Sequence, residues 1–388
     1  DVFTHVGTIV VGSDLVVTTS TGADSVLFDG NVTTGGLVRI DLGAGPAASL
    51  TGGSNAADAL QVTGDVTAGT SISLQKSGTN AAEMTLDGKL AAGSFILVST
   101  GSGNDTITFN DTVTAATDLT VATGGGVDLV TFVKAVRAVA GDVLLNFGAV
   151  TADRSRLILS DTLRAGNNLT ITNTGSGGFT ATIAKAVTAG RNIVLDTGDG
   201  YDVIDSQAVL TAGRDLTVTM DGGGDALQLA KTAGFTAGGD LSVNMGDFDG
   251  IADELAVTGA MAAGGALRLS NKGSGAMTLD LTGAILTAGK GGLFIEAGDS
   301  ADELGLTDVT ITSGGAITID LGGGDDIALV LRGNLTAATD LIFRMGTGND
   351  RIGVQGATLS AARDIFDLGD GDDLLVLADL EGLHGAAS

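Results

Sequence analysis

Apolar and polar residues alternate in short segments along the whole chain, and these segments recur at a regular spacing. In residues 211–229, TAGRDLTVTMDGGGDALQL, apolar side chains occupy alternate positions, at Leu216 and Val218 and again at Leu227 and Leu229. A period of two with many β-branched residues predicts half-buried β-strands, and no segment of comparable length has helical spacing. The two strands are separated by a glycine-rich turn that ends in aspartate.

The first half of this stretch is a motif that recurs through the chain. It consists of small residues followed by Asp or Asn and then an aliphatic strand, and most copies follow one another after 23–26 residues. The clearest copies are GSDLVV (12–17), ATDLTV (116–121), GNNLTI (166–171), GRNIVL (190–195), GRDLTV (213–218), GGDLSV (238–243), ATDLIF (338–343) and ARDIFD (362–367).

The glycine-rich turn in the second half recurs with the same spacing. Its closing aspartate falls at Asp24, Asp58, Asp105, Asp128, Asp202, Asp225, Asp253, Asp302, Asp326, Asp350 and Asp373. Two motifs that keep one phase indicate a repeat array in which each repeat is one coil of stacked strands.

We therefore predict an all-β chain folded as a parallel β-helix, or β-solenoid. It has about fifteen coils of 23–26 residues and forms a single domain over 1–388, with insertions near 41–57 and 246–252. A right-handed coil is the expectation, because crossovers between parallel strands strongly prefer that hand.

Composition adds an unusual acidity to this picture. The 388 residues include 46 Asp or Glu, nearly all of them Asp, and the net charge is −27. Such a charge disfavours nucleic acid and anionic membranes as partners and favours divalent cations. The sequence contains no cysteine and no apolar run that approaches the ~20 residues of a membrane-spanning helix.

Two family resemblances rest on these motifs. The turns GSGND (101–105), GDGYD (198–202), GGGDD (322–326), GTGND (346–350) and GDGDD (369–373) resemble those of RTX calcium-binding proteins. TAGRDLTV (211–218) and TAGGDLSV (236–243) are similar to repeats of filamentous-haemagglutinin-type adhesins. The resemblance implies an extracellular β-helix with a role in adhesion or surface structure. RTX turns repeat in tandem every nine residues, whereas this chain has one such turn in each coil.

Equivalent turns of a solenoid lie above one another, so closing aspartates of adjacent coils should be about one strand spacing apart. Two carboxylates ~4.8 Å apart repel by about 0.9 kcal/mol even in water. Bridging calcium would turn this repulsion into attraction. The alternative is that each aspartate caps its own turn and directs its charge to solvent. The calcium hypothesis selects Asp105, Asp128, Asp202, Asp225, Asp302, Asp326, Asp350 and Asp373 as metal ligands.

A second column of polar residues begins the strands of the other motif. It mixes Asp with Asn, which suits a hydrogen-bonded turn better than a metal site. Its members are Asp14, Asp118, Asn168, Asn192, Asp215, Asp240, Asp340 and Asp364.

Some parallel β-helices are polysaccharide-active enzymes, but these need clustered acid and base residues and usually aromatic subsites. Here aromatic residues make up 3% of the chain and tryptophan is absent, and Phe109, Phe132 and Phe343 belong to the strand pattern. The only irregular charged cluster is Asp153, Arg154 and Arg156. We therefore expect a protein that is not an enzyme, without catalytic or cofactor-binding residues.

The ends of the sequence read as ordinary coils rather than as capping units. DVF at 1–3 resembles the strand DSVLF (24–28), and DLLVLADL (373–380) is a strong strand close to the C-terminus. Uncapped coils favour head-to-tail stacking into a filament or surface layer. The expected partners are other copies of the chain and a cell-surface polysaccharide, at an extracellular or cell-surface location. The alternative is a calcium-stabilised stalk segment of a large adhesin.

Overall fold

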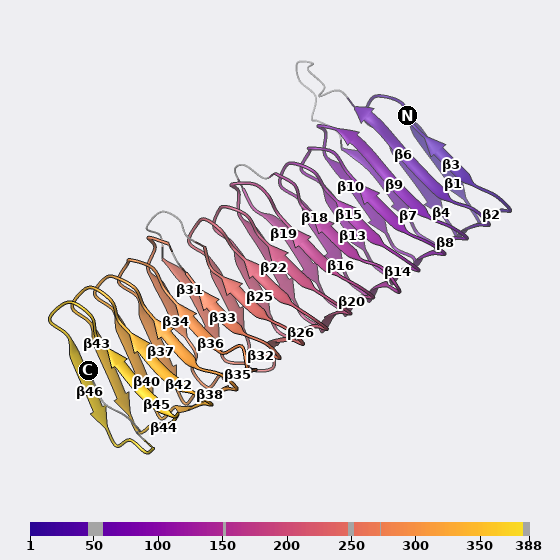
Figure 1. The fold of residues 1–388 in the computed structure, drawn as a ribbon. Helices are drawn as coiled ribbons and strands as arrows, with labels where there is room; N and C mark the ends of the chain where they lie inside the picture. The colour runs from indigo at the N-terminus through magenta and orange to yellow at the C-terminus, as the bar shows by residue number, and fades with distance from the viewer. Residues whose placement is uncertain (46–56, 150–152, 247–251, 272, 383–388) are drawn as a thin grey trace, which may run out of the picture. The chain divides into compact units, whose positions relative to one another are not determined.

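The computed structural model describes residues 1–45, 57–149, 153–246, 252–271 and 273–382. They belong to two compact units, Asp1–Arg191 and Asn192–Ser388. Every regular element among them is a β-strand (Figure 1), and no helix there is long and apolar enough to cross a membrane.

Both units are built from coils that contain three short strands each. A coil runs through a strand of sheet A, a strand of sheet B and a strand of sheet C, and three turns join them. We call these turns the A–B, B–C and C–A turns. Each strand pairs in parallel with the equivalent strand of the next coil, so the chain is a parallel β-solenoid, and the two units together contain about fifteen coils. The predicted fold class is confirmed, whereas the hand of the coil and the single domain remain predictions.

In the first unit, each sheet is formed by every third strand in chain order. Sheet A contains β1 (Val2–Val6), β4 (Ser25–Asp29), β7 (Asp58–Val62), β10 (Ala82–Leu86), β13 (Thr106–Phe109), β16 (Leu129–Phe132), β19 (Ser155–Leu159) and β22 (Phe179–Ile183). Sheet B contains β2 (Ile9–Val11), β5 (Val32–Thr34), β8 (Val66–Ala68), β11 (Leu90–Ala92), β14 (Val113–Ala115), β17 (Val136–Ala138), β20 (Leu163–Ala165) and β23 (Val187–Ala189). Sheet C contains β3 (Leu15–Thr18), β6 (Val38–Gly45), β9 (Ile72–Gly78), β12 (Ile96–Ser99), β15 (Leu119–Ala122), β18 (Val143–Asn146) and β21 (Leu169–Thr172).

The second unit repeats this arrangement. Sheet A contains β25 (Val203–Ser206), β28 (Ala226–Leu229), β31 (Asp253–Val257), β34 (Met277–Asp280), β37 (Glu303–Thr307), β40 (Ile327–Leu331), β43 (Arg351–Gln355) and β46 (Leu374–Ala378). Sheet B contains β26 (Val209–Ala212), β29 (Gly234–Ala237), β32 (Ala260–Ala263), β35 (Ile285–Ala288), β38 (Thr310–Ser313), β41 (Asn334–Ala337) and β44 (Thr358–Ser360). Sheet C contains β24 (Ile193–Asp196), β27 (Leu216–Thr219), β30 (Leu241–Asn244), β33 (Leu267–Ser270), β36 (Leu293–Glu296), β39 (Ile317–Asp320), β42 (Asp340–Arg344) and β45 (Arg363–Asp367).

The strand register shows where the coil length changes. Glu83 pairs with Thr106, one regular coil further along the chain. Ser25 instead pairs with Ala59, and Ala226 pairs with Glu254, so these two coils are longer. The predicted insertions near 41–57 and 246–252 fall in these coils, although most of their residues lie outside the described part of the chain.

The core consists of the inward-facing aliphatic and aromatic residues of all three sheets. In β15, Leu119 and Val121 are buried while Thr120 and Ala122 alternate with them on the outer side. Equivalent residues of adjacent coils stack on one another. The Phe109 and Phe132 rings, for example, lie nearly parallel with their centroids 4.6 Å apart. The alternation read from the sequence therefore gives the burial pattern of each strand.

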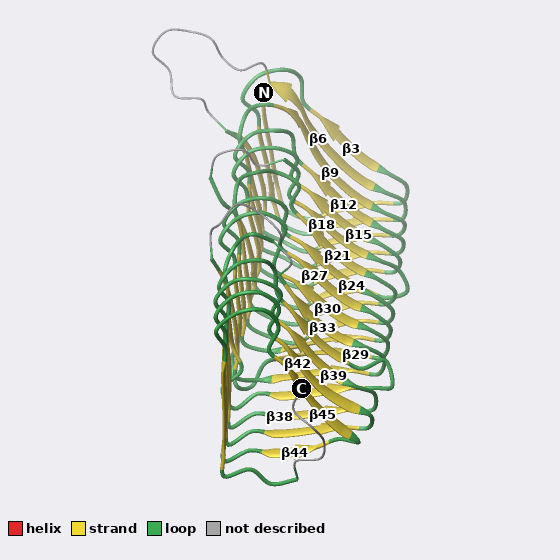
Figure 2. Cartoon of the chain, turned by 60° about the vertical axis from the view of Figure 1, so that its left-hand side comes forward, coloured by secondary structure: helices red, strands yellow, loops and turns green. Residues whose placement is uncertain are grey.

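Turns of adjacent coils also lie one above another, in columns between the sheets (Figure 2). In the C–A turns this stacking brings backbones so close that a side chain cannot fit between them. Gly346 has a φ of +89°, and a Cβ atom on it would lie 1.5 Å from the Gly322 carbonyl oxygen of the preceding coil. Glycine is required there both by its backbone conformation and by the space available.

Candidate functional site

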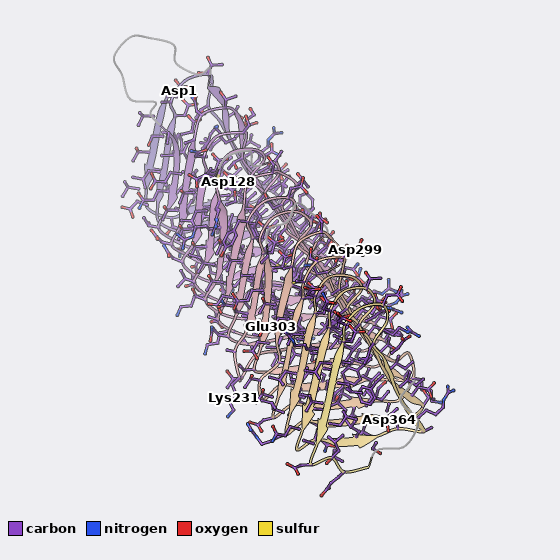
Figure 3. All side chains as sticks on the ribbon, turned by 90° about the vertical axis from the view of Figure 1, so that its left-hand side faces the viewer. Asp1, Asp128, Lys231, Asp299, Glu303 and Asp364 are labelled. Carbon is purple, nitrogen blue, oxygen red and sulfur yellow. The ribbon has the colours of Figure 1, made fainter. Side chains whose placement is uncertain are left out.

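The closing aspartates of the glycine turns form a column along the C–A turns, immediately before the strands of sheet A. Figure 3 labels one of them, Asp128, in the first unit. Seven of the eight predicted metal ligands are at most 2% exposed, namely Asp105, Asp128, Asp202, Asp225, Asp302, Asp326 and Asp350. The eighth, Asp373, is half-buried in the last described coil. These side chains therefore point into the solenoid and not toward solvent.

The inward direction follows from the pleat of the strand. In β13 the residues Ile107 and Phe109 face the core, and Asp105 precedes them by two and four positions. Successive side chains of an extended chain alternate between faces, so Asp105 shares the inner face with them. The sequence contains this signal, but the hypothesis of solvent-facing or calcium-bridging aspartates did not use it.

Each aspartate of the column is hydrogen-bonded to the coil before it. The Asp105 backbone N–H donates to Asp128 Oδ1 at 2.9 Å, and the Asp202 N–H donates to Asp225 Oδ1 at 2.8 Å. In the second unit the same bond joins Asp302 to Asp326, Asp326 to Asp350 and Asp350 to Asp373, at 2.8, 2.8 and 2.9 Å. We call this chain of bonds the aspartate ladder.

The ladder brings together the residues that the sequence placed in neighbouring coils, and it includes others. Asp58 Oδ1 accepts from the Asp24 N–H, and Asp253 Oδ1 accepts from the Asp225 N–H. Where no aspartate closes the turn, the ladder changes its donor or acceptor. The Asp128 N–H donates to Ser155 Oγ at 3.0 Å, and the Met277 N–H donates to Asp302 Oδ1 at 2.6 Å.

The second carboxyl oxygen distinguishes the members of the ladder. Asp24 Oδ2 accepts a hydrogen bond from the Thr19 hydroxyl, five residues earlier, at 2.7 Å. Methionine or leucine stands five residues before three of the later members, at Met220, Leu321 and Met345. Among the described residues, Oδ2 of Asp225, Asp326 and Asp350 is buried without a hydrogen-bond partner, as it also is in Asp58 and Asp302.

Burial raises the pKa of several ladder carboxyls because it removes water from their ionised form. The pKa of Asp225 is raised to about 9, chiefly by burial and further by the carboxyls of Asp202 and Asp253, against the hydrogen bond from the Asp202 N–H. Burial raises the pKa of Asp128 and of Asp326 to about 7 each.

Other members shift less. Burial raises the pKa of Asp105, Asp253 and Asp302 to about 6 each, and hydrogen bonds to their carboxyls oppose the rise. Protonation relieves the repulsion expected between stacked carboxylates. Part of the ladder is therefore uncharged near neutral pH.

Calcium binds through six to eight oxygen ligands, and its carboxylate ligands are ionised. In the described part of the chain, no group of three or more His, Asp or Glu side chains is arranged to hold a metal ion. Seven of these eight carboxyls already use one oxygen to accept from a backbone N–H. Burial favours the protonated form of six of them, because it raises their pKa. Calcium binding by these eight aspartates accordingly stays a prediction.

The second column of Asp and Asn residues lies in the B–C turns and is hydrogen-bonded between coils, as its mixed composition indicates. Asp240 Oδ1 accepts from the Ala266 N–H at 2.8 Å, and Asn192 Oδ1 accepts from the Asp215 N–H at 3.3 Å. Both side chains offer the same acceptor oxygen, which is why either residue type serves here.

Asp364 is an exception to this column. Its neighbour Arg363, and not Asp364, is the register partner of Asp340, and the Arg363 guanidinium pairs with the Asp340 carboxylate at 2.8 and 2.9 Å. Asp364 is instead the partner of Leu341 and is 2% exposed. The alignment of ARDIFD with ATDLIF by their aspartates was therefore wrong by one residue, because this coil is one residue shorter than the motif alignment assumed.

The charged cluster of the degenerate repeat lies at the start of β19. Arg156 extends from the outer side of β19 and is exposed, and the Arg154 backbone N–H donates to Asp153 Oδ1 at 3.2 Å. Ser155, between the two arginines, takes the place of an aspartate in the ladder.

Comparisons of the chain with protein-family models, with curated proteins and with solved structures give no match. The likeness to RTX and haemagglutinin-type repeats thus rests on the motifs quoted above, and the functional argument rests on the geometry of this chain.

Proposed function

We propose that this chain is a non-enzymatic, extracellular structural protein whose coils stack end to end with other copies to form a filament or surface layer. The observation that carries the proposal is the open edge of the first and last described coils. Val2 and Val6 in β1 are 82% and 71% exposed, and Leu374 and Val376 in β46 are 52% and 48% exposed. Unpaired strand edges with apolar side chains readily pair with another strand.

The strands at the two edges are equivalent. β46 and β1 are both strands of sheet A, and each follows an aspartate at the ladder position. Asp373 Oδ1 accepts from the Asp350 N–H, and the Asp1 ammonium donates to Asp24 Oδ1. A second copy that stacks on the last coil would place its Asp1 carboxyl above the Asp373 N–H and continue the ladder.

Proline substitutions test this pairing without disturbing the bonds inside one copy. In β1 the Asp1 carbonyl and the Gly7 N–H bond to the next coil, so by alternation the Thr4 N–H faces the open edge. In β46 the Leu374 N–H and the Ala378 carbonyl bond to β43, so the Leu377 N–H faces the open edge. Thr4→Pro and Leu377→Pro should each stop assembly, because proline at a free edge removes only the donor that another copy would use.

The measurement is electron microscopy of the purified chain, with sedimentation velocity on the same samples. Regular fibres from the wild type and monomers from both proline variants, with unchanged circular dichroism, are expected. The alternative function, a calcium-stabilised stalk segment of a larger adhesin, predicts unassociated wild-type coils whose melting temperature falls when a chelator replaces millimolar calcium. Unassociated wild-type protein in both conditions would refute the filament.

A further inference from the structure

The outer face of sheet B in the first unit carries two stacked arginines. Arg137 in β17 and Arg164 in β20 are register partners in adjacent coils, and both side chains are exposed. The two side chains therefore extend from backbone positions about one strand spacing, ~4.8 Å, apart. Like charges directly opposite each other in neighbouring strands are destabilising, so this placement calls for a compensating negative charge.

The chain does not supply that charge in the way it does for other arginines. Arg332 pairs with Asp308 of the preceding coil at 2.7 Å, and Arg363 pairs with Asp340 at 2.8 Å. No ion pair joins Arg137 or Arg164 to any residue in the described ranges. Two acids of the same coils are engaged elsewhere: Asp161 accepts a hydrogen bond from the Thr162 N–H, and Asp142 accepts one from the Asn168 N–H.

The surrounding sequence is basic, in contrast to the rest of the chain. Residues 133–191 contain seven Lys or Arg and three Asp and no Glu, whereas the whole chain contains 19 Lys or Arg and 46 Asp or Glu. The basic residues are Lys134, Arg137, Arg154, Arg156, Arg164, Lys185 and Arg191, and the acidic ones are Asp142, Asp153 and Asp161. Lys134 lies in the A–B turn of the coil that contains Arg137, and Lys185 lies in the A–B turn of the coil after Arg164. Both lysines are exposed, and Asp161 occupies the equivalent turn between them.

Beside the arginine pair the surface is hollowed and carries hydroxyl groups. Arg164 and Thr188 line a shallow hollow together with small residues, Ala165, Gly166, Ala189 and Gly190. Thr114 is the register partner of Arg137, and Thr188 is the partner of Arg164, so threonines flank the pair on both sides. A linear ligand lying along the stack would meet a hydroxyl, two guanidiniums and a second hydroxyl in successive coils.

We propose that this face binds a linear carboxylated polysaccharide, and that Arg137 and Arg164 each bind one carboxylate. A guanidinium binds a carboxylate through two parallel hydrogen bonds, which a lysine cannot do. Single-stranded nucleic acid is a poorer fit, because the outward residues of these four strands, Thr114, Arg137, Arg164 and Thr188, include no aromatic side chain for base stacking.

The test is fluorescence anisotropy with a dye-labelled oligogalacturonate at low ionic strength. The wild type is compared with the double variant Arg137→Gln/Arg164→Gln and with Arg351→Gln. Arg351 is an exposed strand arginine in β43, outside the basic region, and serves as the matched control. Loss of two charge-assisted contacts should weaken binding at least about tenfold in the double variant, and the control should bind as the wild type does. Unchanged circular dichroism would show that the double variant is folded.

Three results would overturn the proposal. They are no saturable binding by the wild type, equal loss of affinity in Arg351→Gln, and binding of an oligodeoxythymidylate as tight as that of the oligogalacturonate. Sedimentation without glycan tests whether a second copy covers this face instead. Self-association that is lost only in the double variant would assign the face to that contact. The inference goes beyond end-to-end assembly, and the two proline variants report on assembly separately.

Discussion

At the scale of single residues, the two carboxyl oxygens of a ladder aspartate lie in different environments. Oδ1 must accept a backbone N–H from the neighbouring coil, which any carboxyl or amide oxygen can do. The remaining oxygen is buried, and in Asp225, Asp326 and Asp350 it has no hydrogen-bond partner among the described residues. An unpaired buried charge is unfavourable, so the protonated carboxyl has the lower free energy in the folded chain. The raised pKa values follow from this difference.

A protonated ladder predicts that the free energy of unfolding of the Asp326→Asn variant increases relative to that of the wild type as the pH rises. The pKa of Asp326 is raised to about 7 in the folded chain by burial, from an unfolded value of 3.8. A raised pKa means that the folded wild type loses stability as the pH climbs from the unfolded toward the folded value, whereas asparagine does not titrate. The variant's relative stability should increase by roughly 1.4 kcal/mol per pH unit between about pH 4 and pH 7 and then level off.

Urea denaturation of both proteins at several pH values measures this difference. The control is Asp299→Asn, at an exposed position in a C–A turn that takes no part in the ladder. It should show no such pH-dependent gain. A constant difference between Asp326→Asn and the wild type from pH 4 to pH 8 would contradict the protonated ladder.

At the scale of elements, the close spacing of adjacent coils determines which residue type can occupy the C–A turn. Gly322, Gly346 and Gly369 occupy one column with φ of +85°, +89° and +81°, and each carbonyl lies where the next glycine's Cβ would be. The repeat of glycine therefore follows from the close contact between coils. The same turn places the ladder aspartate at the beginning of the following strand.

Gly346→Ala should consequently destabilise the fold by at least about 2 kcal/mol, because the added methyl meets the Gly322 carbonyl and the backbone must keep a positive φ. Gly353→Ala is the matched control. Gly353 lies in β43 in an extended conformation, and its nearest obstacle is the flexible end of Leu329 at 3.0 Å. Denaturant midpoints followed by circular dichroism should fall for Gly346→Ala only, and equal midpoints for the two variants would contradict the close-contact account.

At the scale of the whole molecule, the formal charge of −27 overstates the negative charge of the folded chain at pH 7. That count takes every aspartate as ionised. Burial raises the pKa of Asp225 to about 9 and that of Asp128 to about 7, so these carboxyls hold protons that the unfolded chain releases. The strongly acidic composition is thus compatible with closely stacked coils.

Unfolding at pH 7 should therefore release protons, about two per chain if Asp225 is protonated and Asp128 and Asp326 are each half protonated. Calorimetry in buffers with different ionisation enthalpies counts them. The same linkage makes the protein less stable as the pH rises from about 4 to 9, unlike proteins that unfold in acid. No release of protons on unfolding at pH 7 would show that the ladder is ionised in the folded chain.

The sequence by itself determined the fold class and the strands of sheets A and C, because a local property, the alternation of apolar residues, repeats with one phase. The third strand of each coil, in sheet B, is too short for this alternation to locate it. The sequence also placed the ladder aspartates in neighbouring coils. Only the tertiary structure decided where their side chains point, which oxygen is bonded and which residue partners Asp340, since those depend on atoms about 24 positions away in the chain. The stacked pair Arg137 and Arg164 belongs to the same class: two residues 27 positions apart become neighbours only when the coils are set in register.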